Sequence, residues 1–274
     1  MPFIETRDGT DLYVKEWGSG RPVVLIHGWP LNADSWDAQA VALAEAGYRV
    51  IAYDRRGFGR SDQPWDGYDY DSLADDLAEV LDATEATSDV TLVGFSMGGG
   101  EVARYMSRHN GKGVVATALV GSVVPGLLQS DSNPDGAPRD ALEGIGQGIR
   151  ADRHGFFRDF FPGFYGNGWI KKEVSQGVID AAFQWSNMAG LRGILACAES
   201  FSFTDFVPDL PGFTMPTLII HGTDDRTVPI AATAQRAAKA IPGAELIEYD
   251  GAAHGLTASH QDQFIEDLLR FLGR

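Results

Sequence analysis

The 274-residue sequence has a single cysteine, Cys197, so no disulfide can form within the chain. It has no run of 18 or more apolar residues, which excludes a membrane-spanning helix. The N-terminus lacks a basic segment followed by an apolar one, so no secretory signal is expected. Internal repeats and low-complexity tracts are absent too. These absences predict a globular, cytoplasmic protein.

Positive charge is scarce, because 22 lysine and arginine residues face 38 aspartate and glutamate residues, giving a formal net charge of −16. A surface of this sign repels nucleic acids and anionic membranes, so neither is expected as a partner. His109, His154 and His260 lack ligand-like spacing with Asp, Glu or Cys, so no metal site is predicted. No phosphate-binding motif is present, and no cofactor is expected.

The sequence does contain an alternation of apolar, strand-forming runs with stretches of helical spacing. Asp8-Gly9 joins the first two runs and signals a hairpin. The later alternation predicts one α/β domain around a mainly parallel sheet with right-handed crossovers. Strands are predicted at residues 3–5, 11–17, 23–26, 49–53, 90–95, 114–120, 217–221 and 245–249, and helices at 36–46, 71–84, 97–109, 230–240 and 261–272.

The alternation stops between residues 121 and 215. This segment begins with prolines and glycines and then gathers seven aromatic residues within residues 156–169. We expect it to be a helical cap with an apolar, aromatic-lined pocket, inserted into a core of residues 1–120 and 216–274. An insertion at this point lies over the edge of the sheet where ligands bind, so some of the rings should face that edge while others form the core of the cap.

The segment around Ser96 carries the clearest chemical signal. Residues 90–95 predict a strand, Ser96 follows between Gly94 and Gly98, and a helix is predicted directly afterwards. In this context G-x-S-x-G displays a serine on a tight turn with a strained, positive φ. The helix start would point N–H groups at the space above the hydroxyl, where negative charge develops during acyl transfer. The same glycines also suit a plain strand-to-helix turn, so a catalytic interpretation needs partners elsewhere.

Those partners follow along the chain. A serine hydroxyl needs a base, and the base needs an orienting carboxylate. Asp224 and Asp225 follow the strand at 217–221, and His254, flanked by small residues, follows the strand at 245–249. The order Ser, Asp, His is typical of a serine elbow on an α/β sheet. The residues alone leave both aspartates open.

Other polar residues nearby are expected to be structural. His27 and His221 precede glycines at strand ends and are interpreted as ordering their loops. Arg55, Arg56 and Arg60 are expected to pair with carboxylates of their own loop.

Four segments together resemble one family. They are His27-Gly28-Trp29-Pro30, residues 54–61, residues 94–100 and the loop of His254. Over its whole length the chain resembles the α/β-hydrolases, and more narrowly the bacterial arylesterases and cofactor-free, non-haem haloperoxidases that also act as perhydrolases. The resemblance implies a mostly parallel eight-stranded sheet with helices on both faces and a helical cap.

The resemblance also implies roles for individual residues. Ser96 would be the nucleophile and His254 the general acid and base. Asp225 would orient His254, because the family's D-x-x-V-P spacing falls on residues 225–229. The backbone N–H groups of Trp29 and Met97 would form the oxyanion hole.

The implied activity is hydrolysis of small aryl or alkyl carboxylic esters through an acyl-enzyme, with promiscuous formation of peracids from hydrogen peroxide. In perhydrolase-like relatives a proline at position 30 accompanies the peroxide activity, and the Trp29 carbonyl could accept a hydrogen bond from peroxide; a rigid turn without chemical role is the alternative. The residues implied to line the substrate pocket are Pro30, Val123, Leu127, Val228 and Ile230.

Two alternatives to an esterase stay open. Some relatives with an intact triad act as small-molecule receptors with slow turnover, and others are lactonases or amidases. A small-molecule ester is the expected partner, and the sequence leaves open whether the chain forms a homo-oligomer.

Overall fold

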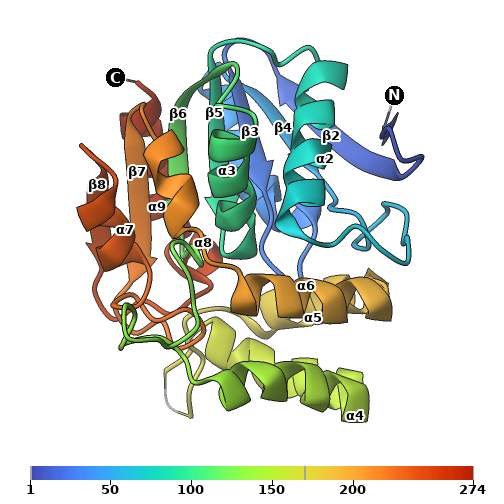
Figure 1. Ribbon diagram of the computed structural model, residues 1–274, viewed down its shortest axis with the longest axis vertical. Coiled ribbons are helices and arrows are strands. Elements are labelled where there is room, and N and C mark those ends of the chain that lie inside the picture. The colour runs from blue at the N-terminus through green and yellow to red at the C-terminus, as the bar shows by residue number, and fades with distance from the viewer. Residues whose placement is uncertain (1, 170, 274) are drawn as a thin grey trace.

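The computed structural model of the protein describes residues 2–169 and 171–273. Its centre is an eight-stranded sheet with the strand order β1-β2-β4-β3-β5-β6-β7-β8 (Figure 1). β1 and β2 form the predicted hairpin, β2 pairs antiparallel with β4, and all other pairs are parallel. The strands are β1 (Phe3–Glu5), β2 (Asp11–Gly18), β3 (Pro22–Ile26), β4 (Arg49–Tyr53), β5 (Val90–Phe95), β6 (Val114–Val120), β7 (Thr217–Gly222) and β8 (Glu245–Tyr249).

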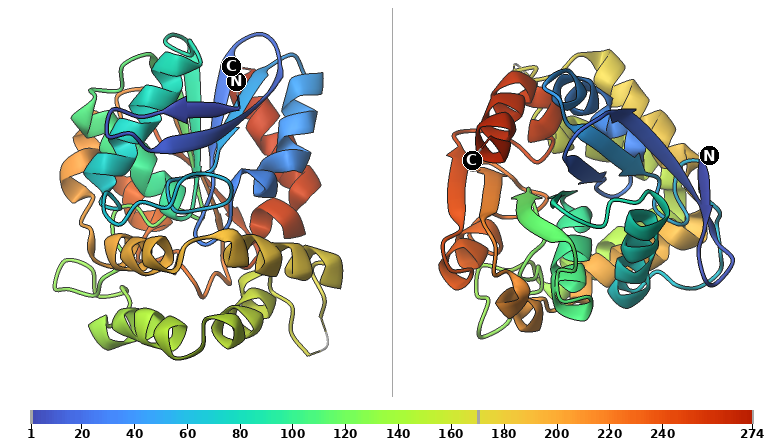
Figure 2. Two further views of the ribbon diagram at one scale, coloured as in Figure 1. Left: turned by 90° about the vertical axis from the view of Figure 1, so that its right-hand side faces the viewer. Right: turned by 90° about the horizontal axis from the view of Figure 1, so that it is seen from above.

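Helices cover both faces of this sheet, as expected for a parallel sheet of apolar strands (Figure 2). α1 and α9 pack together on one face, and α2 and α3 pack together on the other. β5 is consequently buried at every position. The helices are α1 (Asp37–Glu45), α2 (Tyr70–Ala83), α3 (Met97–Arg108), α4 (Arg139–Phe164), α5 (Gln176–Met188), α6 (Leu191–Phe203), α7 (Ala234–Ala240), α8 (Leu256–Ser259) and α9 (Gln261–Leu272), with short 3-10 helices η1 (Ala33–Trp36) and η2 (Val207–Gly212).

The α/β fold with a mostly parallel eight-stranded sheet is therefore confirmed. One predicted element differs: the helix expected from residue 230 begins only at Ala234. Thr233 has a non-helical backbone (φ −125°, ψ −87°), and its hydroxyl donates to the carbonyl of Pro229. The side chain thus closes a turn before the helix can start. No helix within the described ranges is both long enough and apolar enough to span a bilayer.

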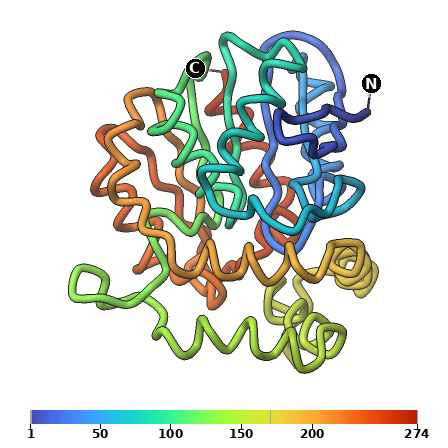
Figure 3. The backbone as a smooth tube through the Cα atoms, turned by 45° about the vertical axis from the view of Figure 1, so that its right-hand side comes forward, coloured from blue at the N-terminus to red at the C-terminus, as the bar shows by residue number. Residues whose placement is uncertain are grey.

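Between β6 and β7 the chain leaves the sheet, builds α4, α5 and α6 beyond its carboxyl edge, and returns (Figure 3). α4 consists of two helical parts that meet at Asp152, whose backbone is not helical (φ −155°, ψ 91°). Of the aromatic cluster, Phe157 and Phe161 are fully buried, whereas Trp169 is 98% exposed. Phe157 and Phe161 therefore belong to the core of these helices, whereas the exposed Trp169 does not.

Candidate active site

Ser96 stands on a turn that only glycines allow. It links β5 to α3 with φ 54° and ψ −118°, the strained conformation predicted for a nucleophile elbow. A Cβ atom at Gly94 would lie 2.5 Å from the carbonyl oxygen of Gly98, and one at Gly98 would lie 2.5 Å from that of Ile26. Side chains at these two positions would force the turn open, so the glycines hold Ser96 at the end of β5.

The loops after β7 and β8 bring a base and an acid to this serine. The Nε2 atom of His254 lies 2.9 Å from Oγ of Ser96, and its Nδ1 atom lies 2.6 Å from Oδ2 of Asp225. All three residues are at least 94% buried. Asp224, the other aspartate left open by the sequence, pairs with Arg226 at the surface instead. The structure thus brings together the three residues predicted as a triad and points to Asp225 as the acid.

The Asp225 carboxylate is held in its charged form. Its burial by itself raises the pKa, but the charge of His254 and hydrogen bonds from His221 and His254 outweigh that effect, so the pKa lies well below its usual range. Its Oδ1 atom also accepts hydrogen bonds from the backbone N–H groups of Thr227 and Val228, at 2.9 and 2.8 Å. An ionised carboxylate at Nδ1 fixes the tautomer in which Nε2 can take a proton from Ser96.

Two aromatic rings seat the imidazole of His254. Phe95 lies 5.1 Å away between ring centroids, and Phe164, from the end of α4, meets the imidazole edge-on at 4.9 Å. The carbonyl of Phe164 also accepts a hydrogen bond of 2.7 Å from the N–H of Gly255. The end of α4 therefore contacts the loop of His254 directly.

The two residues predicted to form an oxyanion hole flank the serine. Met97 is the first residue of α3, where helix N–H groups have no partner within the helix. Trp29 follows Gly28, and a Cβ atom at Gly28 would lie 3.0 Å from Cβ of Ser96, which shows how closely this loop approaches the serine. Trp29 and Ser96 line the same cavity, and the peptide bond between Trp29 and Pro30 is cis.

A buried ionic cluster supports the same loop. Arg55 is ion-paired with Glu101 of α3, donates 2.6 Å to the carbonyl of His27, and offers its own backbone N–H to Nε2 of His27 at 3.0 Å. Tyr53 donates to the second oxygen of Glu101 at 2.7 Å. Burial raises the pKa of Glu101, although Arg55 and Tyr53 oppose this effect. His27 orders its loop as predicted.

The arginine partners correct the expectation from sequence in part. Only Arg60 binds a carboxylate of its own loop, Asp54. Arg55 and Arg56 reach instead to Glu101 and to Asp76 of α2. Glu101 is a residue of this site that the sequence did not predict, although an acidic residue amid small and apolar positions directly after the serine elbow is a visible signal.

A cavity of about 380 Å³, lined largely by residues of α4, opens onto Ser96. Three of the five predicted pocket residues line it, namely Val123, Leu127 and Val228, whereas Pro30 and Ile230 do not. Pro30 is buried elsewhere, and Ile230 packs against the hydrophobic core instead. Three rings of the aromatic cluster, Phe156, Phe160 and Phe164, line the cavity, as expected for some members of that cluster. The sequence did not identify the rest of the lining from α4, α6 and the preceding segment: Ala137, Ala141, Leu142, Ile145, Gly163 and Phe201.

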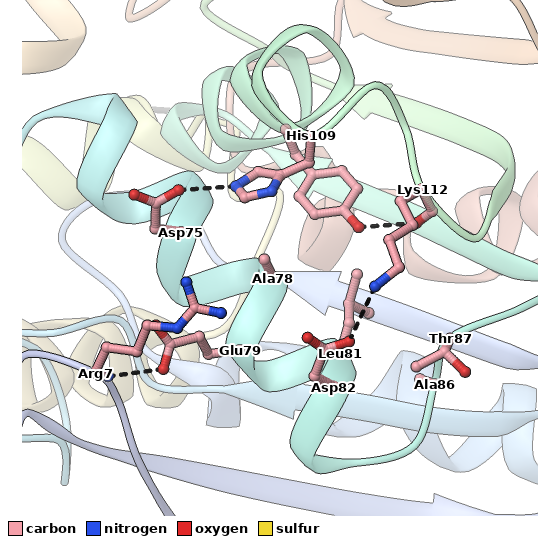
Figure 4. Close-up of a pocket in the computed structure, with 11 residues that line it drawn as sticks. Arg7, Asp75, Ala78, Glu79, Leu81, Asp82, Ala86, Thr87, His109 and Lys112 are labelled. Atoms are coloured by element: carbon pink, nitrogen blue, oxygen red, sulfur yellow. Dashed lines mark hydrogen bonds and ion pairs between the residues drawn. The ribbon is translucent and has the colours of Figure 1, made fainter.

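A second, smaller cavity of about 180 Å³ lies between α2 and α3, away from the serine (Figure 4). Its charged side chains pair with one another, so it offers no converging set of free groups. The pairs are Arg7 with Glu79, His109 with Asp75, and Lys112 with Asp82. Within residues 2–169 and 171–273, no group of three or more His, Cys, Asp or Glu side chains is arranged to hold a metal ion.

A family model described as alpha/beta hydrolase fold matches residues 21–260 of the chain. The chain belongs to the alpha/beta hydrolase family. It is 44% identical to the non-heme chloroperoxidase CPO-A1 of Kitasatospora aureofaciens, with 100% of both chains covered. It is 37% identical to the bifunctional esterase/perhydrolase DCH of Acinetobacter calcoaceticus over 99% of each chain. The crystal structure of a bromoperoxidase from Bacillus anthracis superposes with a TM-score of 0.95 at 43% identity, covering 99% of each chain. The predicted resemblance to non-haem haloperoxidases and perhydrolases is thereby confirmed.

Proposed function

We propose that this alpha/beta hydrolase cleaves small carboxylic esters through an acyl-enzyme formed at Ser96. The observation that carries the proposal is the continuous chain of contacts from Ser96 Oγ to His254 Nε2, 2.9 Å, and from His254 Nδ1 to Asp225 Oδ2, 2.6 Å. These contacts provide a nucleophile, a base and an orienting carboxylate in the geometry that acyl transfer requires.

The reaction has two halves. Ser96 Oγ attacks the ester carbonyl while His254 takes its proton, and the N–H groups of Met97 and Trp29 stabilise the oxyanion. His254 then returns the proton to the departing alcohol, leaving an acyl group on Ser96. Water, activated by His254, attacks this acyl group. The resulting tetrahedral intermediate breaks down, which releases the acid and restores Ser96.

The cavity suggests a neutral, apolar acyl or alcohol group. Its lining is aliphatic and aromatic, and it includes no carboxylate. Its one charged side chain, Arg226, is 85% exposed and paired with Asp224, so it lies at the mouth rather than against the serine. An apolar group gains free energy by leaving water for such a lining, whereas a charged group would lose its hydration.

Sustained turnover of p-nitrophenyl acetate tests the proposal against a small-molecule receptor. An esterase releases many equivalents of p-nitrophenol per chain, whereas a receptor with an intact triad stops after about one. For p-nitrophenyl esters of increasing acyl length, the rate of hydrolysis should fall once the acyl group no longer fits the cavity of about 380 Å³. Lactones and anilides tested in parallel would identify a lactonase or an amidase. A single slow turnover on every substrate would contradict the proposal.

We further propose that the acyl-enzyme also reacts with hydrogen peroxide. Peroxide then replaces water as the attacking group, loses a proton to His254 and leaves as a peracid, so that Ser96 is restored as in hydrolysis. Support comes from the relatives named non-heme chloroperoxidase and esterase/perhydrolase. Trp29 lies beside the serine, and its carbonyl is the suggested acceptor for the peroxide O–H group.

Pro30→Leu tests this suggestion. Pro30 is buried and restricts the backbone of Trp29, the residue before it, so we expect the variant to form peracid at least about tenfold more slowly relative to ester hydrolysis. The rates of peracid formation and of hydrolysis are measured on the same ester, with and without peroxide. An unchanged ratio of the two rates would show that Pro30 only shapes the turn.

We also propose that residues 121–215 form a cap over a core of residues 1–120 and 216–274. We further propose that the enzyme is cytoplasmic, which cell fractionation can check. Light scattering would determine whether the chain forms a homo-oligomer.

A further inference from the structure

We propose that His221 is a positioning residue for catalysis, which holds the Asp225 carboxylate and the Val228 wall of the cavity in register with His254. The inference rests on the proposed function, since it concerns the acid of the same triad. His221 is the fifth residue of β7 and is fully buried, four residues before Asp225. It is not part of the serine, histidine and aspartate set itself, and its side chain does not line the cavity.

The contacts of His221 converge on the turn that carries Asp225. Its Nε2 atom lies 2.8 Å from the carbonyl oxygen of Val228 and 3.2 Å from Oδ2 of Asp225. Oδ2 is the same oxygen that receives Nδ1 of His254. With the two backbone N–H groups on Oδ1, His221 brings the number of donors around this carboxylate to four.

The chemistry of these neighbours fixes the direction of the hydrogen bond. A backbone carbonyl can only accept, so Nε2 of His221 must carry the proton and donate. The same N–H group then points between Val228 O and Asp225 Oδ2. The Nδ1 atom of His221 is buried and has no polar partner among the described residues, so the contacts of the ring are confined to this turn.

One effect on catalysis follows from this geometry. The carboxylate cannot rotate away from His254 while both of its oxygens are held, so the imidazole stays aligned with Ser96. The groups that face Asp225 are His221 and His254, whereas the charged neighbours Asp224 and Arg226 lie at the surface.

His221→Phe removes the N–H group and keeps a planar ring. We expect kcat for p-nitrophenyl acetate to fall roughly ten- to hundredfold, because the base is misaligned, while KM stays within about twofold. His221→Gln, whose amide N–H reaches the position of Nε2, should restore kcat.

His221→Asn provides the matched comparison, because its amide N–H reaches only the position of Nδ1, and it should behave like His221→Phe. This comparison decides the matter even where the phenylalanine variant does not fold. Leu268→Ala, in the buried face of α9 away from the site, controls for lost stability: it should lower the melting temperature while kcat of the folded enzyme stays within about twofold. Equal rates for the glutamine and asparagine variants would overturn the proposal. That result would leave the role of Ser96 intact, which is tested separately.

Discussion

Ser96→Ala should abolish ester turnover, with kcat falling by about 10⁴- to 10⁶-fold. No other group replaces the Oγ atom that lies 2.9 Å from the base, so the acyl-enzyme cannot form. The remaining rate would come from the oxyanion hole and from substrate binding alone. Steady-state hydrolysis of p-nitrophenyl acetate measures the loss, and mass spectrometry of the quenched enzyme should show an acetyl group on the unaltered chain only.

Ser107→Ala is a suitable control, because Ser107 lies at the opposite end of the same helix and binds Asp209. It should turn over normally. A parallel pair of variants decides between the two aspartates: Asp225→Asn should lose about 10⁴-fold in kcat, since the wrong tautomer of His254 is favoured, and Asp224→Asn should lose little. Full activity of Ser96→Ala would exclude an acyl-enzyme at this serine.

Removal of the charge on Glu101 should have the largest effect on stability. Glu101→Gln leaves the guanidinium of Arg55, 1% exposed, without a counter-charge in the core, and we expect unfolding to cost about 3–5 kcal/mol less than in the unaltered protein. The folded fraction of this variant should also hydrolyse esters more slowly, because Arg55 holds the carbonyl of His27 just before the oxyanion loop. Urea unfolding followed by fluorescence measures the stability.

The double variant Arg55→Met with Glu101→Met separates the effect of leaving one buried charge unpaired from the effect of losing the whole ion pair. It buries no unpaired charge, so it should be more stable than Glu101→Gln, while its ester turnover should stay low because the loop support is gone. If the double variant were the less stable of the two, the cluster would contribute net stability rather than only position the loop.

Much of this molecule could be predicted because its signals are local. The apolar runs and their helical alternation identified the sheet, and the glycines around Ser96 reported a backbone conformation that is indeed present at φ 54°. The choice of Asp225 over Asp224 came from the family's spacing, because two adjacent aspartates give no local signal of which one turns inward.

What the sequence could not show depends on contacts between distant segments. Glu101 meets Arg55 across 46 positions, and His221 acquires its role only from the way the turn after β7 folds back onto it. Both Val228 and Ile230 were predicted to line the pocket, but only Val228 does. The direction of a side chain in an irregular turn follows no simple period, so the sequence could not separate the two. The sequence predicted that some rings of residues 156–169 face the serine but not which ones, since α4 could present any of them.

Phe164 gives this enzyme a constraint for anyone who would redesign it. The residue lines the cavity, and its ring and carbonyl also contact His254 and Gly255. Substitutions made here to admit bulkier esters would loosen the proton acceptor at the same time, so selectivity and speed cannot be tuned independently at this position. Val123 and Leu127 line the same cavity without a ring contact to His254, and they are the better places to begin a library for altered substrate range.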